Sequence, residues 1–197
     1  MSKSVPRIPP LKRSEWTDEA RDVFAVMGGA EAWEQGPPYG IISIFAQHPS
    51  LTRPFLTYAR HLLTKSILPD RVRELIVLYV GWTCKSEYEW ASHLREGLRS
   101  GAINAADIDA IKQGPDSSHW SDSERALLRA VDQMRSSYSL DDEMWAALAE
   151  QFDHRQMMEL VFAIGTYMML SMVTNSLRIP LEGGAEGEEL AKLYGTP

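Results

Sequence analysis

Helical spacing of apolar residues, divided by helix-ending residues, is the feature that most constrains the fold of this chain. From Ser43 almost to the end, the sequence has no alternating apolar and polar run long enough to be a β-strand. Prolines, glycines and capping residues separate segments of ordinary helix length. The expected helices cover residues 49–65, 70–84, 87–100, 104–113, 121–136, 140–151 and 154–176. The sequence therefore predicts an all-α fold.

The N-terminal part is expected to differ. Residues 1–14 contain three prolines, which deny the chain helical hydrogen bonds, so we expect an extended arm of the kind that can lie across a neighbouring subunit. Residues 15–27 show helical spacing, and the stretch GPPYG at 36–40 is expected to be a loop. We expect one helical domain over residues 15–182, followed by a tail at 183–197.

Composition and charge limit the classes of function. The 197 residues are 44% hydrophobic, which is enough for a sizeable core. The net charge of -7 argues against nucleic acid and anionic membranes as partners, and leaves small molecules or other protein chains. The N-terminus lacks the apolar run of a secretory signal, so we expect a cytoplasmic protein. The apolar run Leu160–Val173 is too short to cross a membrane and is expected to be a buried helix.

The cysteine and histidine content restricts the chemistry. Cys84 is the only cysteine, which excludes an internal disulfide and a CxxC redox pair. His48, His61, His119 and His154 are expected to serve turns and helices, since none has a convincing metal-binding spacing with a partner. We therefore expect no metal site and no compulsory cofactor, and chemistry carried by oxygen and imidazole groups.

The stretch SEYEWASH, residues 86–93, concentrates acid–base groups. Ser86 and Glu89 have the spacing of a capping box, in which the hydroxyl accepts from the Glu89 amide and the carboxylate reaches back to the Ser86 amide. A cap does not require His93, which lies four residues after Glu89 on the same helix face. A hydrogen bond donated by the imidazole to that carboxylate would fix the tautomer of the imidazole and raise its pKa. The stretch fits both a helix start and an acid–base site.

Glu74 is a second unusual acid, because it lies in the apolar stretch RVRELIVLYVGW. A buried carboxylate needs a partner or must hold its proton. Arg71 or Arg73 could neutralise it. Alternatively, the short link between the two helices would pack them antiparallel and bring His93 within hydrogen-bonding distance of Glu74. A short echo exists between residues 69–77 and 153–161, in which Glu74 and Glu159 each open an apolar helix. It is compatible with two related halves or with ordinary amphipathic composition.

Longer stretches resemble a known family. LPDRVRELIVLYVGWTCKSEYEWASH resembles the central motif of the carboxymuconolactone decarboxylase family, which shares its fold with alkylhydroperoxidase D-like proteins. RIPPL, AQHPSL and ELVFAIGTYMMLSMVTN are also similar to that family, so the resemblance covers about residues 7–182. It implies an alkylhydroperoxidase D-like helical bundle of two pseudo-symmetric hairpins, assembled as a homo-trimer or homo-hexamer.

The resemblance also places functional residues. The peroxidase branch uses a Glu, a CxxC pair and a His in a proton relay; here the Glu falls on Glu74, the His on His93, and the two cysteines on Ser86 and Glu89. A disulfide cycle needs two thiols, so this variant without the CxxC pair is not expected to be a peroxidase. The decarboxylase branch carries a Glu-x-x-x-His pair, which Glu89 and His93 match.

We therefore expect a cofactor-free lyase that acts on a small conjugated carboxylic acid or lactone from aromatic-compound breakdown, by decarboxylation or a related isomerisation or hydrolysis. His93, Glu89 and Glu74 are the expected catalytic residues. The candidate substrate-binding residues are Arg71, Arg73, Tyr88, Trp90 and Ser86. An alkylhydroperoxidase-like antioxidant protein and a non-catalytic oligomeric binding protein are the alternatives.

Overall fold

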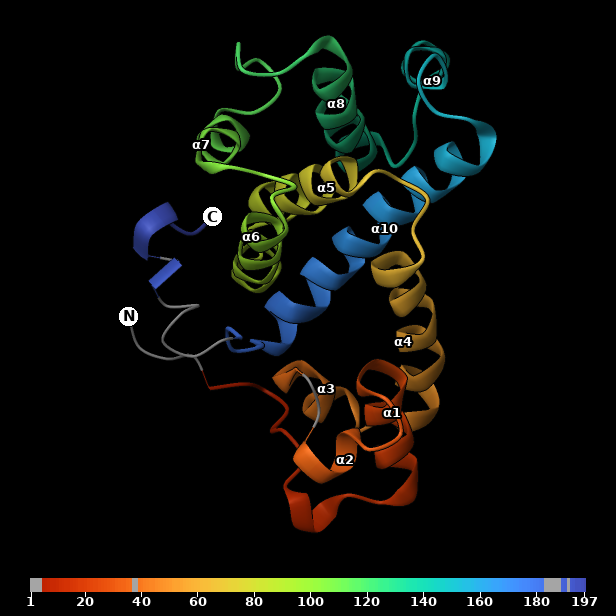
Figure 1. Cartoon of the computed structure of the whole chain (residues 1–197), viewed down its shortest axis with the longest axis vertical. Helices are drawn as coiled ribbons and strands as arrows, with labels where there is room; N and C mark the ends of the chain where they lie inside the picture. Colours follow the sequence, from red (N-terminus) through yellow and green to blue (C-terminus); the bar gives the residue numbers. More distant parts are fainter. Residues whose placement is uncertain (1–4, 37–38, 183–188, 191) are drawn as a thin grey trace. The chain divides into compact units, whose positions relative to one another are not determined.

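The computed structural model in Figure 1 describes residues 5–36, 39–182, 189–190 and 192–197. Over these residues the secondary structure is helical and includes no strand, which confirms the all-α prediction. The contacts divide the chain into two compact units, Met1–Ser66 with Leu177–Glu182, and Ile67–Ser176 with Gly183–Pro197. The expected arm and tail lie partly outside the described residues, which omit 1–4, 183–188 and 191.

The first unit is built around α1 (Asp18–Gly28), which contacts the other three helices of the unit. The helices are α1 (Asp18–Gly28), α2 (Ala32–Gln35), α3 (Gly40–Phe45) and α4 (Pro49–Thr64), after a short 3-10 turn at Arg13–Glu15. The prediction of a loop through residue 40 is wrong at its end, since α3 begins at Gly40. Burial of Ile41, Ile42 and Ile44 offsets the local turn signals there. The sequence also gave no indication of α2.

The described part of the N-terminal arm lies along its own unit. The amide of Arg7 donates to the Leu177 carbonyl at 2.9 Å, and the amide of Leu11 donates to the Ser43 carbonyl at 3.0 Å. Residues 5–12 form no helix. These bonds fix the arm to the chain from which it starts.

The second unit contains the longer helices of the chain. They are α5 (Asp70–Thr83), α6 (Glu87–Ser100), α7 (Ala105–Gln113), α8 (Asp122–Ser137), α9 (Asp142–Ala149) and α10 (His154–Leu177), whose last residue belongs to the first unit. Each begins and ends within two residues of its predicted bounds. The segmentation by Pro69, Ser86 and Gly101 therefore located these helices well.

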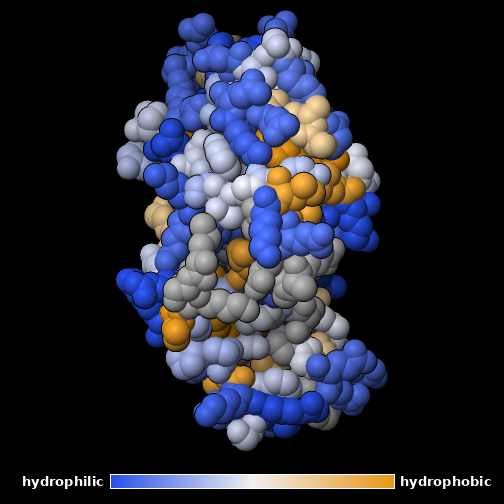
Figure 2. All heavy atoms as spheres, turned by 90° about the vertical axis from the view of Figure 1, so that its left-hand side faces the viewer, coloured by the Kyte–Doolittle hydropathy of each residue, from blue (hydrophilic) through white to orange (hydrophobic). Residues whose placement is uncertain are grey.

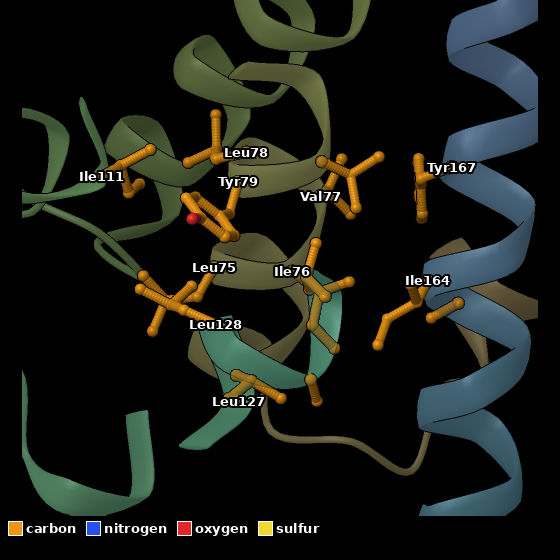
Figure 3. Close-up of a cluster of buried hydrophobic side chains, with 14 of the residues drawn as sticks. Leu75, Ile76, Val77, Leu78, Tyr79, Ile111, Leu127, Leu128, Ile164 and Tyr167 are labelled. Carbon is orange, nitrogen blue, oxygen red and sulfur yellow. The ribbon is translucent and has the colours of Figure 1, made fainter. Parts of the chain in front are cut away.

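Helix α5 is the centre of this unit, and it contacts α6, α7 and α8. Figure 3 shows Ile76 and Val77 pointing toward Ile164 and Tyr167 of α10, while residues on the other side of α5 face α7 and α8. The side chains from 75 to 78 are all 0% exposed. Complete burial of an aliphatic side chain contributes about 1.5–3 kcal/mol, so α5 anchors the helices that carry the site.

Helix α10 is buried on one face only, which corrects the expectation of a buried helix. It is long and apolar enough to cross a membrane by length and composition, and 50% of its most apolar window is buried inside the structure. Its exposed apolar residues include Met158 at 64% and Met172 at 60%. Figure 2, a space-filling view of one face of the molecule, shows mostly hydrophilic residues, with hydrophobic residues gathered in a few patches.

Candidate active site

A tight hairpin of α5 and α6 builds the candidate site. The link between the helices is short, and Lys85 takes a left-handed conformation with φ of 54°. A Cβ atom on Gly81 would lie 3.2 Å from the backbone nitrogen of Trp90, so the glycine lets the two helices approach closely. The antiparallel pairing expected from the short link is therefore confirmed.

The hairpin brings Glu74 and His93 into direct contact. Nδ1 of His93 lies 2.9 Å from Oε2 of Glu74, and the two residues are 9% and 1% exposed. Of the three partners that the sequence left open for Glu74, the structure uses His93 and Arg73. Nε and Nη2 of Arg73 each lie 3.3 Å from Oε1 of the same carboxylate.

The two pairings keep Glu74 ionised. Burial would raise its pKa, but the charge and hydrogen bond of His93, followed by those of Arg73, outweigh burial and lower the pKa. Burial would lower the pKa of His93, but Glu74 and then Glu89 raise it. An ionised carboxylate can only accept hydrogen bonds, so Nδ1 of His93 carries a proton and donates it. Nε2 is the ring nitrogen left for chemistry.

Glu89 is the second acid beside this imidazole. Its Oε2 lies 3.8 Å from Nε2 of His93, beyond hydrogen-bonding distance, and the residue is 4% exposed. Burial raises the pKa of Glu89 to about 7, against the charge attraction of His93. The two glutamates thus have opposite shifts. Glu74 holds and orients the ring, while Glu89 is able to keep or release a proton near neutral pH.

Only half of the predicted capping box forms at the start of α6. The Ser86 hydroxyl accepts from the amide of Glu89 at 3.3 Å, as expected. The Ser86 amide, however, donates to the carbonyl of Gly81 at 2.8 Å, so the prediction that this amide donates to the Glu89 carboxylate is wrong. The tight hairpin satisfies that amide with α5 backbone. This leaves the Glu89 carboxylate next to His93.

Helix α10 supplies a wall that the sequence did not indicate. Thr174 Oγ1 lies 3.0 Å from the Ser86 hydroxyl and donates to the Leu170 carbonyl at 2.9 Å, so Ser86 is the donor of the pair. The ring of Tyr167 meets the ring of His93 edge to face, with centroids 5.2 Å apart. Tyr167 lies in the apolar run Leu160–Val173 and Thr174 directly follows it, 88 positions from Ser86, so nothing local distinguishes the two residues from core.

The candidate substrate-binding aromatics lie in the interior. Trp90 is 0% exposed, packs on Trp82 with ring centroids 5.1 Å apart, and donates its indole N–H to the Gly195 carbonyl at 2.9 Å. Tyr88 is buried as well. In this arrangement the role that the geometry gives to Trp90 is to pack α6 against its neighbours.

Arg71 is engaged elsewhere. Its guanidinium makes a two-pronged contact with Asp107 at 2.8 and 2.9 Å and a further bond with Glu124 at 2.7 Å. His119 Nε2 lies 2.7 Å from the same Asp107 carboxylate. Asp107 and Glu124 are the third residues of α7 and α8, and both close capping boxes. Arg71 therefore joins two helix N-termini to α5, and it contributes no contact to Glu74.

Comparison with known proteins places this geometry in a family. The family model described as carboxymuconolactone decarboxylase family matches residues 49–133, which include Glu74, Glu89 and His93. The recognition drawn from the sequence is thereby confirmed. Among curated proteins, no match to the chain was found.

Solved structures share the fold. The debrominase Bmp8 in complex with 2,3,4-tribromopyrrole is 18% identical, with a TM-score of 0.75 over 98% of this chain and 100% of that one. A peroxidase-related protein with an alkylhydroperoxidase AhpD core from Ralstonia eutropha JMP134 is 16% identical, with a TM-score of 0.73 over 91% and 94%. A peroxidase-related protein from Silicibacter sp. TM1040 is 16% identical, with a TM-score of 0.73 over 92% and 95%. The fold is alkylhydroperoxidase D-like.

Within the carboxymuconolactone decarboxylase family segment, the α5–α6 hairpin carries the three acid–base groups. Tyr167 and Thr174 lie beyond residue 133, outside the matched segment. The second wall of the site thus comes from a part of the chain that the family model does not cover. Cys84, at the end of α5, is half-buried, and burial raises the pKa of its thiol.

Proposed function

We propose that the protein is a cofactor-free acid–base enzyme acting on a small conjugated carboxylic acid or lactone, with decarboxylation as its reaction. The observation that carries the proposal is the buried group in which Glu74 fixes Nδ1 of His93 and leaves Nε2 beside Glu89. The carboxymuconolactone decarboxylase match supports the reaction class. The complex of Bmp8 with a brominated pyrrole supports a small conjugated ring as the kind of ligand that this fold receives.

The chemistry follows from the charges of the group. In decarboxylation, the bond between the substrate carbon and its carboxylate breaks, carbon dioxide leaves, and the electron pair passes to a conjugated carbonyl of the substrate. The resulting carbon then takes a proton from Nε2 of His93 or from the carboxyl of Glu89. Glu74, ionised and held by Arg73, stabilises the imidazolium form. Isomerisation or hydrolysis would use the same groups.

The absence of a second thiol argues against peroxidase chemistry. The positions that a CxxC pair would take hold Ser86 and Glu89, and Cys84 has no second cysteine in the sequence with which to form a disulfide. Its thiol is also held in the less reactive protonated form by burial. The similarity to peroxidase-related proteins therefore concerns the fold and does not support peroxidase chemistry.

The test compares two histidines that each contact a buried carboxylate. Wild type, His93→Ala and His119→Ala are assayed by absorbance and carbon dioxide release on carboxymuconolactones and related ring-cleavage acids. We expect His93→Ala to lose at least about 10²-fold in turnover, and His119→Ala to keep the turnover of the folded fraction. A thiol-plus-peroxide assay with Cys84→Ser runs alongside. Equal turnover by His93→Ala, or thiol-dependent peroxide loss that needs Cys84, would contradict the proposal.

A further inference from the structure

Two contacts set the register of α6 against α10. At one end the hydroxyls of Ser86 and Thr174 lie 3.0 Å apart, and at the other the rings of His93 and Tyr167 lie 5.2 Å apart. The two contacts are separated by seven residues on each helix, about 10 Å of rise, and the numbers run in opposite directions. The two helices are therefore antiparallel, and residues at equal distances from these contacts lie opposite one another.

Halfway between these contacts, each helix carries a buried polar group. Glu89 follows Ser86 by three residues, and Ser171 precedes Thr174 by three, so they fall at the same level. Ser171 is 0% exposed, and its hydroxyl has no hydrogen-bond partner among the described residues. The carboxyl of Glu89 is 3.8 Å from His93. A buried hydroxyl without a partner is costly, and a bound ligand that hydrogen bonds to it would remove that cost.

We propose that Ser171 and Glu89 form the subsite that hydrogen bonds a carboxylate oxygen of a small conjugated acid, beside the imidazole of His93. The assignment rests on the proposed function for its substrate class. Ser171 supplies an O–H donor, and Glu89 in its neutral form supplies a second. With His93 next to them, the oxygen of a bound acid would meet three donors on buried residues, where charge-assisted hydrogen bonds are stronger than in water.

The local charge favours an anion at and below neutral pH. Among the residues that the structure describes, the charged groups joined to His93 by these contacts are Arg73 and Glu74 on α5 and Glu89 on α6. The α10 residues of this interface, Tyr167, Ser171 and Thr174, carry no charge. With Glu89 neutral and His93 protonated, one positive charge remains in excess. Ionisation of Glu89, whose pKa burial raises to about 7, cancels that excess as pH rises. Loss of the His93 proton makes the net charge of the group negative. Binding of an anion should weaken accordingly.

The experiment measures equilibrium binding of 2-furoate, a planar conjugated carboxylate, with neutral 2-furamide for comparison. Wild type, Ser171→Ala and Ser92→Ala are titrated by calorimetry at pH 6 and pH 8. Ser92 is the matched control, because its hydroxyl is also buried without a partner among the described residues, and it precedes His93 by one position, about 100° around the helix. Both substitutions should raise the melting temperature by removing an unpaired buried hydroxyl.

We expect wild type to bind 2-furoate, Ser171→Ala to bind it about three- to tenfold more weakly, and Ser92→Ala to match wild type. The 2-furoate affinity should fall from pH 6 to pH 8, while the 2-furamide affinity stays level. No binding of 2-furoate by wild type at pH 6, unchanged affinity in Ser171→Ala, or an equal loss in Ser92→Ala would each overturn the subsite.

Binding separates this proposal from the proposed function, because it requires no turnover. If 2-furoate binding depends on Ser171 but no acid is converted, the enzyme assignment fails and the subsite stands. If turnover needs His93 while Ser171→Ala leaves both KM and 2-furoate affinity unchanged, the enzyme assignment stands and the subsite fails.

Discussion

Two buried carboxylate clusters, both in contact with α5, satisfy their charges in opposite ways. Asp107 accepts four hydrogen bonds, two from Arg71, one from His119 and one from the amide of Asn104. Burial would raise its pKa, but the bonds from Arg71 and His119 outweigh burial and lower the pKa to about 2. Glu89 has no such set of donors, and its pKa rises to about 7. A saturated carboxylate stabilises the fold, whereas an under-satisfied one retains a proton that chemistry can use.

The largest expected effect is at the saturated cluster. Asp107→Ala leaves Arg71 and His119 without their shared acceptor and removes half of the α7 capping box. We expect a loss of about 3 kcal/mol in the free energy of unfolding, measured by urea denaturation at pH 7; the value lies at the low end for a broken buried pair because Arg71 is 38% exposed and water can solvate it. Turnover per folded molecule should not change. A loss below about 1 kcal/mol would show that the cluster is not what holds α7.

At Glu89 we expect a substitution to increase the free energy of unfolding, whereas at Asp107 it decreases it. Because the folded pKa lies above the ordinary 4.5, the folded state holds the proton longer than the unfolded chain, so stability is full below pH 4.5 and is lost as pH rises through about 7. Glu89→Gln removes the ionisation. We expect it to raise the free energy of unfolding by about 1–3 kcal/mol relative to wild type at pH 8, and to leave it nearly equal at pH 4.5, while activity falls. A destabilised variant at pH 8 would contradict the raised pKa.

The smallest expected change in the free energy of unfolding comes from conservative substitutions of Arg71 and Arg73, which should affect different properties. Arg71→Lys keeps the charge but loses the planar fork that holds Asp107 at two points, so we expect a loss of about 1 kcal/mol in unfolding free energy with an unchanged pH–rate profile. Arg73→Lys alters the partner of Glu74 and should move the pH–rate profile instead. Denaturation curves and pH–rate profiles of the two variants, measured together, decide the matter. Identical responses would erase the distinction between the clusters.

The sequence predicted the parts of the site that lie within one hairpin. The spacing of Glu89 and His93, the burial of Glu74 and the short link sufficed to bring the three groups together. The reciprocal cap from Glu89 failed because its amide target, on Ser86, is taken by the carbonyl of Gly81, a contact that depends on how closely two helices approach. Helix periodicity alone carries no information about that distance.

The sequence did not predict contacts between residues that lie far apart along the chain. The partners of Arg71 lie 36 and 53 residues away, so its neighbour Glu74 looked like the nearer choice. Ser171 and Tyr167 lie in an apolar run whose composition is that of an ordinary core helix. Short helices such as α3 were also not predicted, because α3 is stabilised by burial of Ile41 and Ile42 rather than by local helix propensity.

The bridge from Arg71 to the first turns of α7 and α8 has a consequence for the dynamics of the second unit. Both helices have their capping acids tied to one guanidinium on α5, so neither can fray from its N-terminus without breaking a contact to the central helix. In native-state hydrogen exchange, the first amides of α7 and α8 should therefore open together with those of α5, as one cooperative unit, rather than as two separate helix ends.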